Sequence, residues 1–268
     1  MNVVLIFPVT NNSDKIPEIM KEFSNNIAPK LSILGAEEVE IKFAGTDYIF
    51  VGTNQTLKGK PKGQGILESL KNCAKEPEIV IVCDGSNAIP YINIINIFQE
   101  IISDSEMCCV MANRIKNKAI SEERFLIEQF EVFIIKKYFN HNGEIKDGQC
   151  GLWAYRNPKL LCNNGQIKKI NLTASSYEIE IDLLSEVLEK RLEYSFVDIE
   201  LPQRTSTSSF KYENNLIKMR FLLNKYSKLT EFLLNYLTEF ERINEEVLKK
   251  EEIKKIWENY KKDILSIE

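Results

Sequence analysis

Short apolar runs alternate with helical patterns over the first half of the chain. The apolar runs are VVLIF (3–7), VEIKF (39–43), DYIFV (47–51), IVIVC (79–83) and MCCVMA (107–112). Runs with little polar alternation are typical of strands buried on both faces of a parallel sheet. The helical patterns between them cover 14–34, 63–75 and 90–102. This alternation predicts an α/β fold whose parallel strands are joined by right-handed crossovers.

The apolar run at 79–83 leads directly into an acidic residue, Asp84, within IVIVCDGSNAIP (79–90). Ligands of open α/β sheets bind beyond the carboxyl ends of the strands, where this carboxylate is expected. A carboxylate in that place can hold a hard cation, and the cation can hold a diphosphate. Capping a helix or forming a turn is the alternative role for such an aspartate.

The C-terminal part of the chain, from about residue 212, has a different pattern. Its apolar residues are spaced alternately four and three apart, as in the seam of a coiled coil. The seam residues are Leu222, Tyr226, Leu229, Leu233, Tyr236, Phe240, Ile243 and Val247. The segment 211–268 contains no Pro or Gly, so it is predicted to be helical throughout. Three interpretations stay open: a helix or hairpin packed on the rest of the chain, a dimerising helix pair, and a membrane-surface helix, which the lack of a basic excess disfavours.

Composition is that of an ordinary globular protein, because 44% of the 268 residues are hydrophobic and 28% are charged. The net charge of −4 gives no support for nucleic-acid binding, and no apolar run approaches the roughly 18 residues of a membrane span. The N-terminal MNVVLIFPV is interpreted as a buried strand, because it lacks the features of a signal peptide. The six cysteines show no metal-ligand spacing. Reduced thiols and a cytoplasmic location are therefore expected.

Six segments of the sequence resemble, in order, motifs of the family 2 glycosyltransferases, especially the dolichol-phosphate mannosyltransferase type. They are FPVTNNSDKIPEIMKEF (7–23), KGKPKGQGILESLKNC (58–73), IVIVCDGSNAIP (79–90), MANR (111–114), DGQCGLWAYR (147–156) and YEIEIDLLSEVLEKRLEYSFVDIELPQR (177–204). The third is similar to the strand end that carries the Asp-x-Asp motif, and the fifth to an Asp-x-Gln-Ser-Gly-Phe-Arg block. The last resembles a helix with a Phe-Glu-x-Glu start, followed by a strand. The resemblance covers about residues 3–211 and leaves the helical tail uncovered.

This resemblance implies a GT-A fold, a mostly parallel sheet flanked by helices, over 1–211, with a helical C-terminal extension over 212–268. It also implies transfer of a sugar from a nucleotide-diphosphate donor to an unknown acceptor. Mg²⁺ or Mn²⁺ held by Asp84 would neutralise the charge that grows on the leaving diphosphate. The residues expected to contact the donor and its diphosphate are Pro8, Asn11, Asp84, Ser86, Arg204 and Lys211.

The resemblance also implies roles on the acceptor side. Asp147 and Gln149 are expected at the catalytic centre, although a turn is another role for Asp147. Arg114 and Arg124 match arginines near an acceptor phosphate, which a guanidinium fork suits. His141 is the only histidine of the chain and is expected in a loop, so no histidine base is indicated.

Two polar segments have two interpretations each. RTSTSSFK (204–211) corresponds to a loop that closes on donor and acceptor and excludes water, or it is a plain linker to the tail. KGKPKG (58–63) either touches phosphate or forms an exposed basic turn.

The sequence departs from the family pattern at positions that bear on the donor site. The departures are Val82 for the first Asp of Asp-x-Asp, Thr10 and Asn12 in the first loop, Ala44 where an aspartate contacts the base, and Trp153 for an arginine. A single aspartate can still hold a metal, so a glycosyltransferase is the leading interpretation. A catalytically degenerate nucleotide-sugar binding protein is one alternative. A sugar-phosphate nucleotidyltransferase is another, disfavoured because no Gly-rich, Arg-containing loop follows the first strand.

Overall fold

The computed structural model divides the chain into two compact units. The sheet unit comprises Met1–Asn117 and Lys146–Gln203, and the helical unit comprises Lys118–Ile145 and Arg204–Glu268. The structure describes residues 1–9, 16–44, 48–51, 55–58, 61–84, 89–114, 120–156, 162–163, 166–167, 170–199, 201 and 212–267. The expected domain boundary after residue 211 stays a prediction, and the compact units place residues 118–145 with the C-terminal helices.

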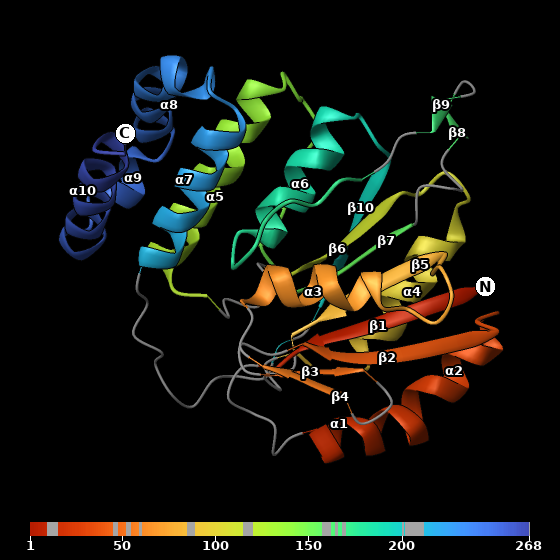
Figure 1. Cartoon of the computed structure of the whole chain (residues 1–268). Coiled ribbons are helices and arrows are strands. Elements are labelled where there is room, and N and C mark those ends of the chain that lie inside the picture. The colour runs from red at the N-terminus through yellow and green to blue at the C-terminus, as the bar shows by residue number, and fades with distance from the viewer. Residues whose placement is uncertain are drawn as a thin grey trace. The chain divides into compact units, whose positions relative to one another are not determined.

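An eight-stranded sheet forms the centre of the sheet unit within the described residues, in the order β10-β6-β7-β5-β1-β2-β3-β4 (Figure 1). Its strands are β1 (Asn2–Pro8), β2 (Glu38–Ala44), β3 (Tyr48–Val51), β4 (Gln55–Lys58), β5 (Ile79–Cys83), β6 (Cys109–Asn113), β7 (Leu152–Arg156) and β10 (Tyr194–Asp198). All run in one direction except β3 and β7, which are antiparallel to their neighbours. A separate short ladder joins β8 (Cys162–Asn163) and β9 (Gln166–Ile167). The predicted α/β class with a mostly parallel sheet is confirmed.

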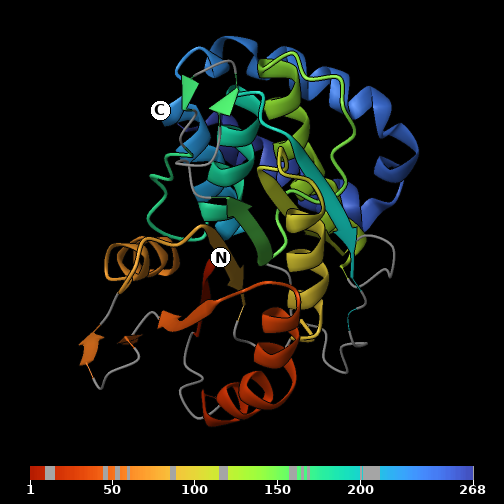
Figure 2. The same ribbon diagram turned by 90° about the vertical axis from the view of Figure 1, so that its right-hand side faces the viewer.

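Helices cover both faces of this sheet, as its buried strands require. They are α1 (Ile16–Glu22), α2 (Ala28–Ile33), α3 (Lys62–Lys71), α4 (Asn93–Ser103) and α6 (Ile179–Glu189). Figure 2 shows α1, α2 and α4 on one side of the sheet and α3 on the other. The helix expected over 14–34 contains a π-helical turn, η2 (Phe23–Ile27), directly before α2. Pro29 in the first turn of α2 has no N–H to donate, which favours a break in the α-helical ladder at this place.

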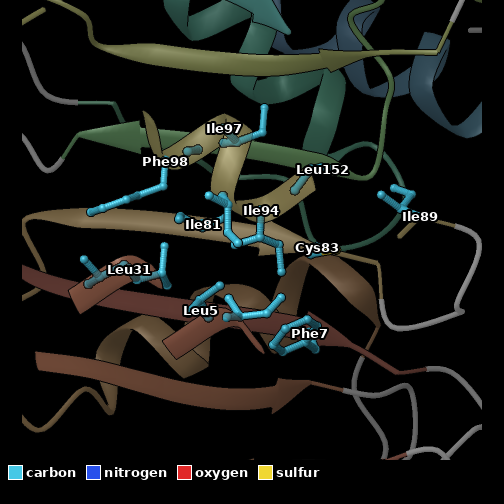
Figure 3. Packing of buried hydrophobic residues seen from close by; sticks show 14 of the residues in the cluster. Leu5, Phe7, Leu31, Ile81, Cys83, Ile89, Ile94, Ile97, Phe98 and Leu152 are labelled. Carbon is cyan, nitrogen blue, oxygen red and sulfur yellow. The ribbon is translucent and has the colours of Figure 1, made fainter. Parts of the chain in front are cut away.

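One hydrophobic layer lies between the sheet and α1, α2 and α4. Alternate residues of the strands point into it, including Leu5 of β1 and Ile81 of β5, both fully buried. Figure 3 shows these side chains with Leu31 from α2 and Phe98 from α4. Because side chains alternate along a strand, Val82 and the position of Asp84 belong to the opposite face, which α3 helps to cover.

The helical unit contains α5 (Glu122–Tyr138), α7 (Glu213–Lys225), α8 (Leu229–Ile243), α9 (Glu245–Leu248) and α10 (Glu251–Leu265). The tail is thus helical for most of its length, but it folds back on itself instead of forming one long seam. Its seam is buried at Leu229 and Leu233 and open at Ile243, whose exposed fraction is 60%. The ring of Phe130 on α5 lies 5.2 Å from those of both Phe240 and Trp257. This aromatic cluster joins the tail to α5.

Among the described residues, no helix has the length and apolar character needed to cross a membrane. The cysteines whose side chains are described are free thiols, as expected from their spacing. They are Cys73, Cys83, Cys108, Cys109 and Cys150.

Candidate donor and metal site

Three segments of the chain meet at one edge of the sheet because of the strand order. β5 ends at Cys83 and β6 ends at Asn113, and the antiparallel β7 begins between them at Leu152. The residues after β5 and β6 therefore flank the segment 147–151 that leads into β7. This places four of the expected site residues at the same edge: Asp84, Arg114, Asp147 and Gln149.

Asp84 is fixed at this edge by its backbone and by its side chain. Its N–H donates a hydrogen bond of 2.9 Å to the carbonyl oxygen of Gly151. A Cβ atom added to Gly151 would lie 2.0 Å from Oδ2 of Asp84. Real Cβ atoms do not approach another heavy atom so closely. The carboxylate therefore lies directly over the bare Cα of Gly151, and 35% of the Asp84 side chain stays exposed.

The carboxylate of Asp84 does not stand alone, because the ammonium of Lys62 lies 2.6 Å from its Oδ1. The same ammonium also forms a close ion pair with Oε1 of Glu180, on the first turn of α6. Burial alone would lower the pKa of Lys62, but the two carboxylates outweigh it and raise that pKa above its ordinary value. Lys62 is thus a permanently charged group shared by two carboxylates, and only 8% of its side chain is exposed.

The backbone around Lys62 is held by close packing against the segment 173–175. A Cβ on Gly63 would lie 2.4 Å from the carbonyl oxygen of Ala174, and the N–H of Gln64 donates to the carbonyl of Ser175 at 2.9 Å. Acidic residues of α6 hold that segment in turn. Asp182 accepts hydrogen bonds from the N–H groups of Thr173 and Ala174 at 2.6 and 2.8 Å. The start of α3 and the start of α6 are therefore fixed to each other.

A second ion pair lies on the other side of β7. Arg114 donates to both oxygens of the Asp147 carboxylate, from Nε at 2.7 Å and from Nη2 at 2.9 Å. The N–H groups of Arg114 and Gln149 donate to the same carboxylate, each at 3.1 Å. Burial alone would raise the pKa of Asp147, but Arg114 and these hydrogen bonds hold it below its ordinary value. A carboxylate held ionised in this way is a weak base.

The thiol between the two ion pairs is not a nucleophile. Cys150 is buried, and burial raises its pKa to about 12, although Arg114 acts in the opposite direction. At neutral pH the sulfur is therefore protonated. The chemistry available at this edge comes from the charged groups on either side of it.

The described residues suit a divalent cation only in part. They contain no group of three or more His, Cys, Asp and Glu side chains that could hold a metal ion. Mg²⁺ needs only one or two protein carboxylates when phosphates and water complete its shell, and Asp84 can supply one. That carboxylate is already paired with Lys62. The site therefore suits a cation that is already coordinated by phosphate oxygens better than it suits a hydrated cation.

The position of Val82 has a structural partner that explains its apolar character. Val82 lies opposite Trp153 in the β5–β7 register, and both side chains are buried, with exposed fractions of 0% and 1%. Two of the departures from the glycosyltransferase pattern are therefore cross-strand neighbours. This cross-strand pair buries no charge, although the buried indole N–H of Trp153 has no hydrogen-bond partner among the described residues.

Of the remaining expected site residues, Pro8 also lies at this edge, because β1 is parallel to its neighbour β5 and the two strands end side by side. Pro8 ends β1 and is buried. Arg124 lies on α5 in the helical unit, where its Nε pairs with Glu128 at 2.8 Å. Asn11, Ser86, Arg204 and Lys211 lie outside the described residues, as do the whole segment 204–211 and residues 59–60 of KGKPKG.

Sequence reasoning missed the two partners of Asp84 and the glycine behind it. Lys62 belongs to KGKPKG, for which phosphate contact or an exposed basic turn was expected, and its ammonium is buried against two carboxylates. Glu180 is the second acid of the YEIEID segment that resembles the Phe-Glu-x-Glu start. Gly151 belongs to the DGQCG segment. Each lay in a segment already singled out, but only the fold shows that they touch Asp84.

Comparison with known proteins gives a likeness of fold. No protein-family model matches the chain, and no curated protein matches it by sequence. A glucosyl-3-phosphoglycerate synthase from Mycobacterium tuberculosis with bound phosphoglyceric acid matches over 84% of this chain and 79% of its own, at 14% identity and a TM-score of 0.55. The same enzyme with Mn²⁺, uridine diphosphate and phosphoglyceric acid matches over 84% and 78%, at 12% identity and a TM-score of 0.56.

A mannosyl-3-phosphoglycerate synthase from Rubrobacter xylanophilus matches over 85% of this chain and 74% of its own, at 12% identity and a TM-score of 0.58. Identities this low show the fold alone. The chain therefore has the mixed, mostly parallel sheet and flanking helices of GT-A-like glycosyltransferases. The expected fold class is confirmed, and the activity is a separate question.

The contact between Asp84 and Gly151 leads to a first prediction. Gly151→Ala should lower the free energy of unfolding by about 1–3 kcal/mol, because the new methyl group forces the Asp84 carboxylate out of place. In an Asp84→Ala background the same change should cost clearly less, since the clashing atoms are gone. Urea unfolding of the two single variants and the double variant measures this coupling. An equal cost in both backgrounds would contradict the contact.

The Arg114–Asp147 pair leads to a prediction on pH. Asp147→Asn should lower the free energy of unfolding at pH 7 by about 3 kcal/mol, because it leaves a buried guanidinium without its counter-charge. The folded-state pKa of Asp147 is depressed, so its contribution is present above the unfolded value of about 3.9 and is lost as the pH falls through the folded value.

The gap in stability between wild type and Asp147→Asn should therefore shrink on acidification below pH ~4. Denaturant unfolding across the pH range checks this. Asp104→Asn, at an exposed aspartate, is the matched control and should show little gap at any pH. A gap for Asp147→Asn that persists unchanged in acid would count against the pair.

Proposed function

We propose that the chain is a glycosyltransferase that moves a sugar from a nucleotide-diphosphate donor to a phosphate-bearing acceptor. The observation that carries the proposal is the partly exposed carboxylate of Asp84 at the carboxyl end of β5, with a buried lysine beside it. Ligands of open α/β sheets bind at this edge. The structural neighbours named above are synthases that act in sugar transfer, and one was solved with Mn²⁺ and uridine diphosphate.

The charges of the site support a role for Mg²⁺ or Mn²⁺. Two carboxylates, Asp84 and Glu180, face one ammonium, Lys62, so this group carries a net negative charge. Arg114 and Asp147 neutralise each other. A diphosphate would be repelled by the first group unless a cation accompanied it. When bound, the cation would neutralise the charge that grows on the leaving diphosphate.

On the acceptor side, Arg114 is the described residue best suited to an anion. Two of its guanidinium nitrogens donate to Asp147, which sets the plane of the guanidinium group. We therefore assign Asp147 to positioning Arg114, together with the N–H of Gln149. The catalytic roles expected of Asp147 and Gln149 stay predictions. Phosphoglyceric acid in the neighbour's structure supports a phosphate-bearing acceptor for this chain.

A catalytically degenerate nucleotide-sugar binding protein is the second candidate. The buried pair of Val82 and Trp153 supports it, because it replaces a carboxylate and an arginine of the pattern that the sequence resembles. Sugar transfer to any acceptor, or hydrolysis of the donor, separates the two candidates, since a binding protein gives neither. Likeness to the dolichol-phosphate mannosyltransferase type and a cytoplasmic location are retained as proposals on the sequence alone.

Self-association through the C-terminal helices is a further part of the proposal. Helix α8 exposes Phe232 and Leu234, with exposed fractions of 43% and 61%, although its other face is buried on α5. A second copy of the chain is an occupant that suits such a face, because the flanking charges are balanced.

We expect light scattering to find a dimer for the full chain, and Leu234→Glu to shift it to the monomer. Asn235→Glu adds the same charge at the neighbouring exposed position and should leave the dimer intact. A wild-type monomer at high concentration would refute self-association.

The metal assignment gives the central test of the proposed function. Asp84→Ala should abolish Mn²⁺-dependent binding of a nucleoside diphosphate, because it removes the only described carboxylate that is placed for the cation. Calorimetry with uridine diphosphate, followed by other nucleoside diphosphates, measures this. Asp104→Ala changes an exposed aspartate and should bind as wild type does. Undiminished binding by Asp84→Ala would sink the assignment.

A further inference from the structure

Lys62 occupies the place where Asp84 would meet a cation. Its ammonium lies 2.6 Å from Oδ1 of Asp84, while Oδ2 lies against Gly151. An ammonium at hydrogen-bond distance neutralises most of the attraction that a lone carboxylate offers a second cation. A hydrated Mg²⁺ or Mn²⁺ would have to displace a buried, charged lysine for a single protein ligand. The free protein is therefore poorly suited to bind a divalent cation.

The ion triad is built unevenly, and this decides which pair can open. Glu180 and Lys62 have side chains that are only 7% and 8% exposed, whereas 35% of the Asp84 side chain is exposed. Separating Lys62 from Glu180 would take the ammonium away from a carboxylate that is almost fully buried, which is costly. Separating Lys62 from Asp84 instead leaves a carboxylate that is already partly exposed. The contact with Asp84 is the one that can be exchanged for a ligand.

The backbone confines that exchange to the lysine side chain. Gly63 packs on Ala174 with no room for a Cβ, and Gln64 is hydrogen-bonded to Ser175, so the start of α3 cannot shift without moving this segment. The stem of a lysine has four rotatable bonds, and its ammonium has three donors. Lys62 can therefore stay on Glu180 while its other donors turn to a new acceptor.

We propose that Lys62 is an exchangeable counter-ion that makes the binding of divalent cation and diphosphate mutually dependent. In the free protein Lys62 neutralises Asp84. When the nucleotide binds, Lys62 stays on Glu180 and turns from Asp84 to the diphosphate, and Asp84 becomes available to the cation. The inference rests on the proposed function and adds to it a reason why neither partner binds well alone.

The charge balance supports this exchange. A divalent cation and the diphosphate of a nucleotide sugar carry opposite charges of equal size, so together they leave the net charge of the triad unchanged. The cation alone would meet a paired carboxylate, and the diphosphate alone would meet the negative charges of Asp84 and Glu180. Binding both at once avoids each of these costs.

The experiment measures Mn²⁺ binding by electron paramagnetic resonance, with and without uridine diphosphate. Mn²⁺ bound by the nucleotide itself is measured without protein and subtracted. The wild type should hold little Mn²⁺ alone, and the nucleotide should raise its affinity about 10-fold or more. Lys62→Met should bind Mn²⁺ about 10-fold more tightly than wild type without nucleotide, and the nucleotide should then add little.

Two variants serve as controls. Lys62→Arg keeps the positive charge and should restore both the weak binding of free Mn²⁺ and the dependence on nucleotide. Lys75→Met removes an exposed lysine that pairs with Glu38 and should behave as wild type. Circular dichroism confirms that each variant is folded. If Lys62→Met does not fold, Lys62→Gln removes the same charge with a polar side chain, and the same comparison of Mn²⁺ affinity with and without nucleotide decides the matter.

The outcomes separate the inference from the proposed function. If wild type and Lys62→Met bind Mn²⁺ equally well without nucleotide, while Asp84→Ala loses nucleotide binding, the exchange is overturned and the proposed function stands. Equal Mn²⁺ affinity of the wild type with and without nucleotide overturns the exchange as well. If no nucleoside diphosphate changes Mn²⁺ binding and Asp84→Ala has no effect, both fail.

Discussion

One buried ammonium group joins three segments of the chain at the carboxyl edge of the sheet. Lys62 lies between carboxylates from two other parts of the chain, Asp84 after β5 and Glu180 at the start of α6. The buried charges of Lys62 and Glu180 are tolerated only while they remain in contact, and Asp84 adds a partly exposed carboxylate to the group, so the elements that carry them must keep a fixed spacing. The close approach of Gly63 to Ala174 and the bare Cα of Gly151 both serve this spacing. The geometry of the edge follows from the requirement to pair these charges.

A second ion pair, on the far side of β7, also pairs buried charges. Arg114 and Asp147 form a fork-to-fork pair, and two backbone N–H groups complete the ring of donors around the carboxylate. The charged side chains described at this edge thus each lie beside a side chain of opposite charge. Such a site is rigid before a ligand arrives, and its groups can bind a new partner only by loosening an old one. Selectivity in a site of this kind comes from ligands that replace the lost interaction in full.

Features that depend on local sequence patterns could be predicted, whereas contacts between residues far apart in the chain could not. Strand runs such as IVIVC and VVLIF predicted β5 and β1 because residues buried on both faces are apolar throughout. Asp84 was found because it interrupts such a run. The tail was correctly expected to be helical, and a hairpin was one of its interpretations, but the breaks at Tyr226 and Asn244 were not located, since neither residue is a strong helix breaker. The partnership of Lys62 with Asp84 and Glu180 joins positions far apart in the chain, and no spacing rule reports it. Trp153 and Val82 looked like separate departures from a pattern until the register of β5 and β7 paired them.

The contact of the Asp84 carboxylate with the bare Cα of Gly151 also limits which substitutions the chain can accept. As long as residue 84 is an aspartate in its present rotamer, residue 151 has only one admissible identity. If residue 84 is replaced by a smaller residue, this steric clash is removed and residue 151 can carry a side chain. Residues 84 and 151 are therefore expected to change together in related chains. A chain that keeps the aspartate is expected to keep the glycine, whereas a chain that has lost the aspartate can carry a larger residue at this position.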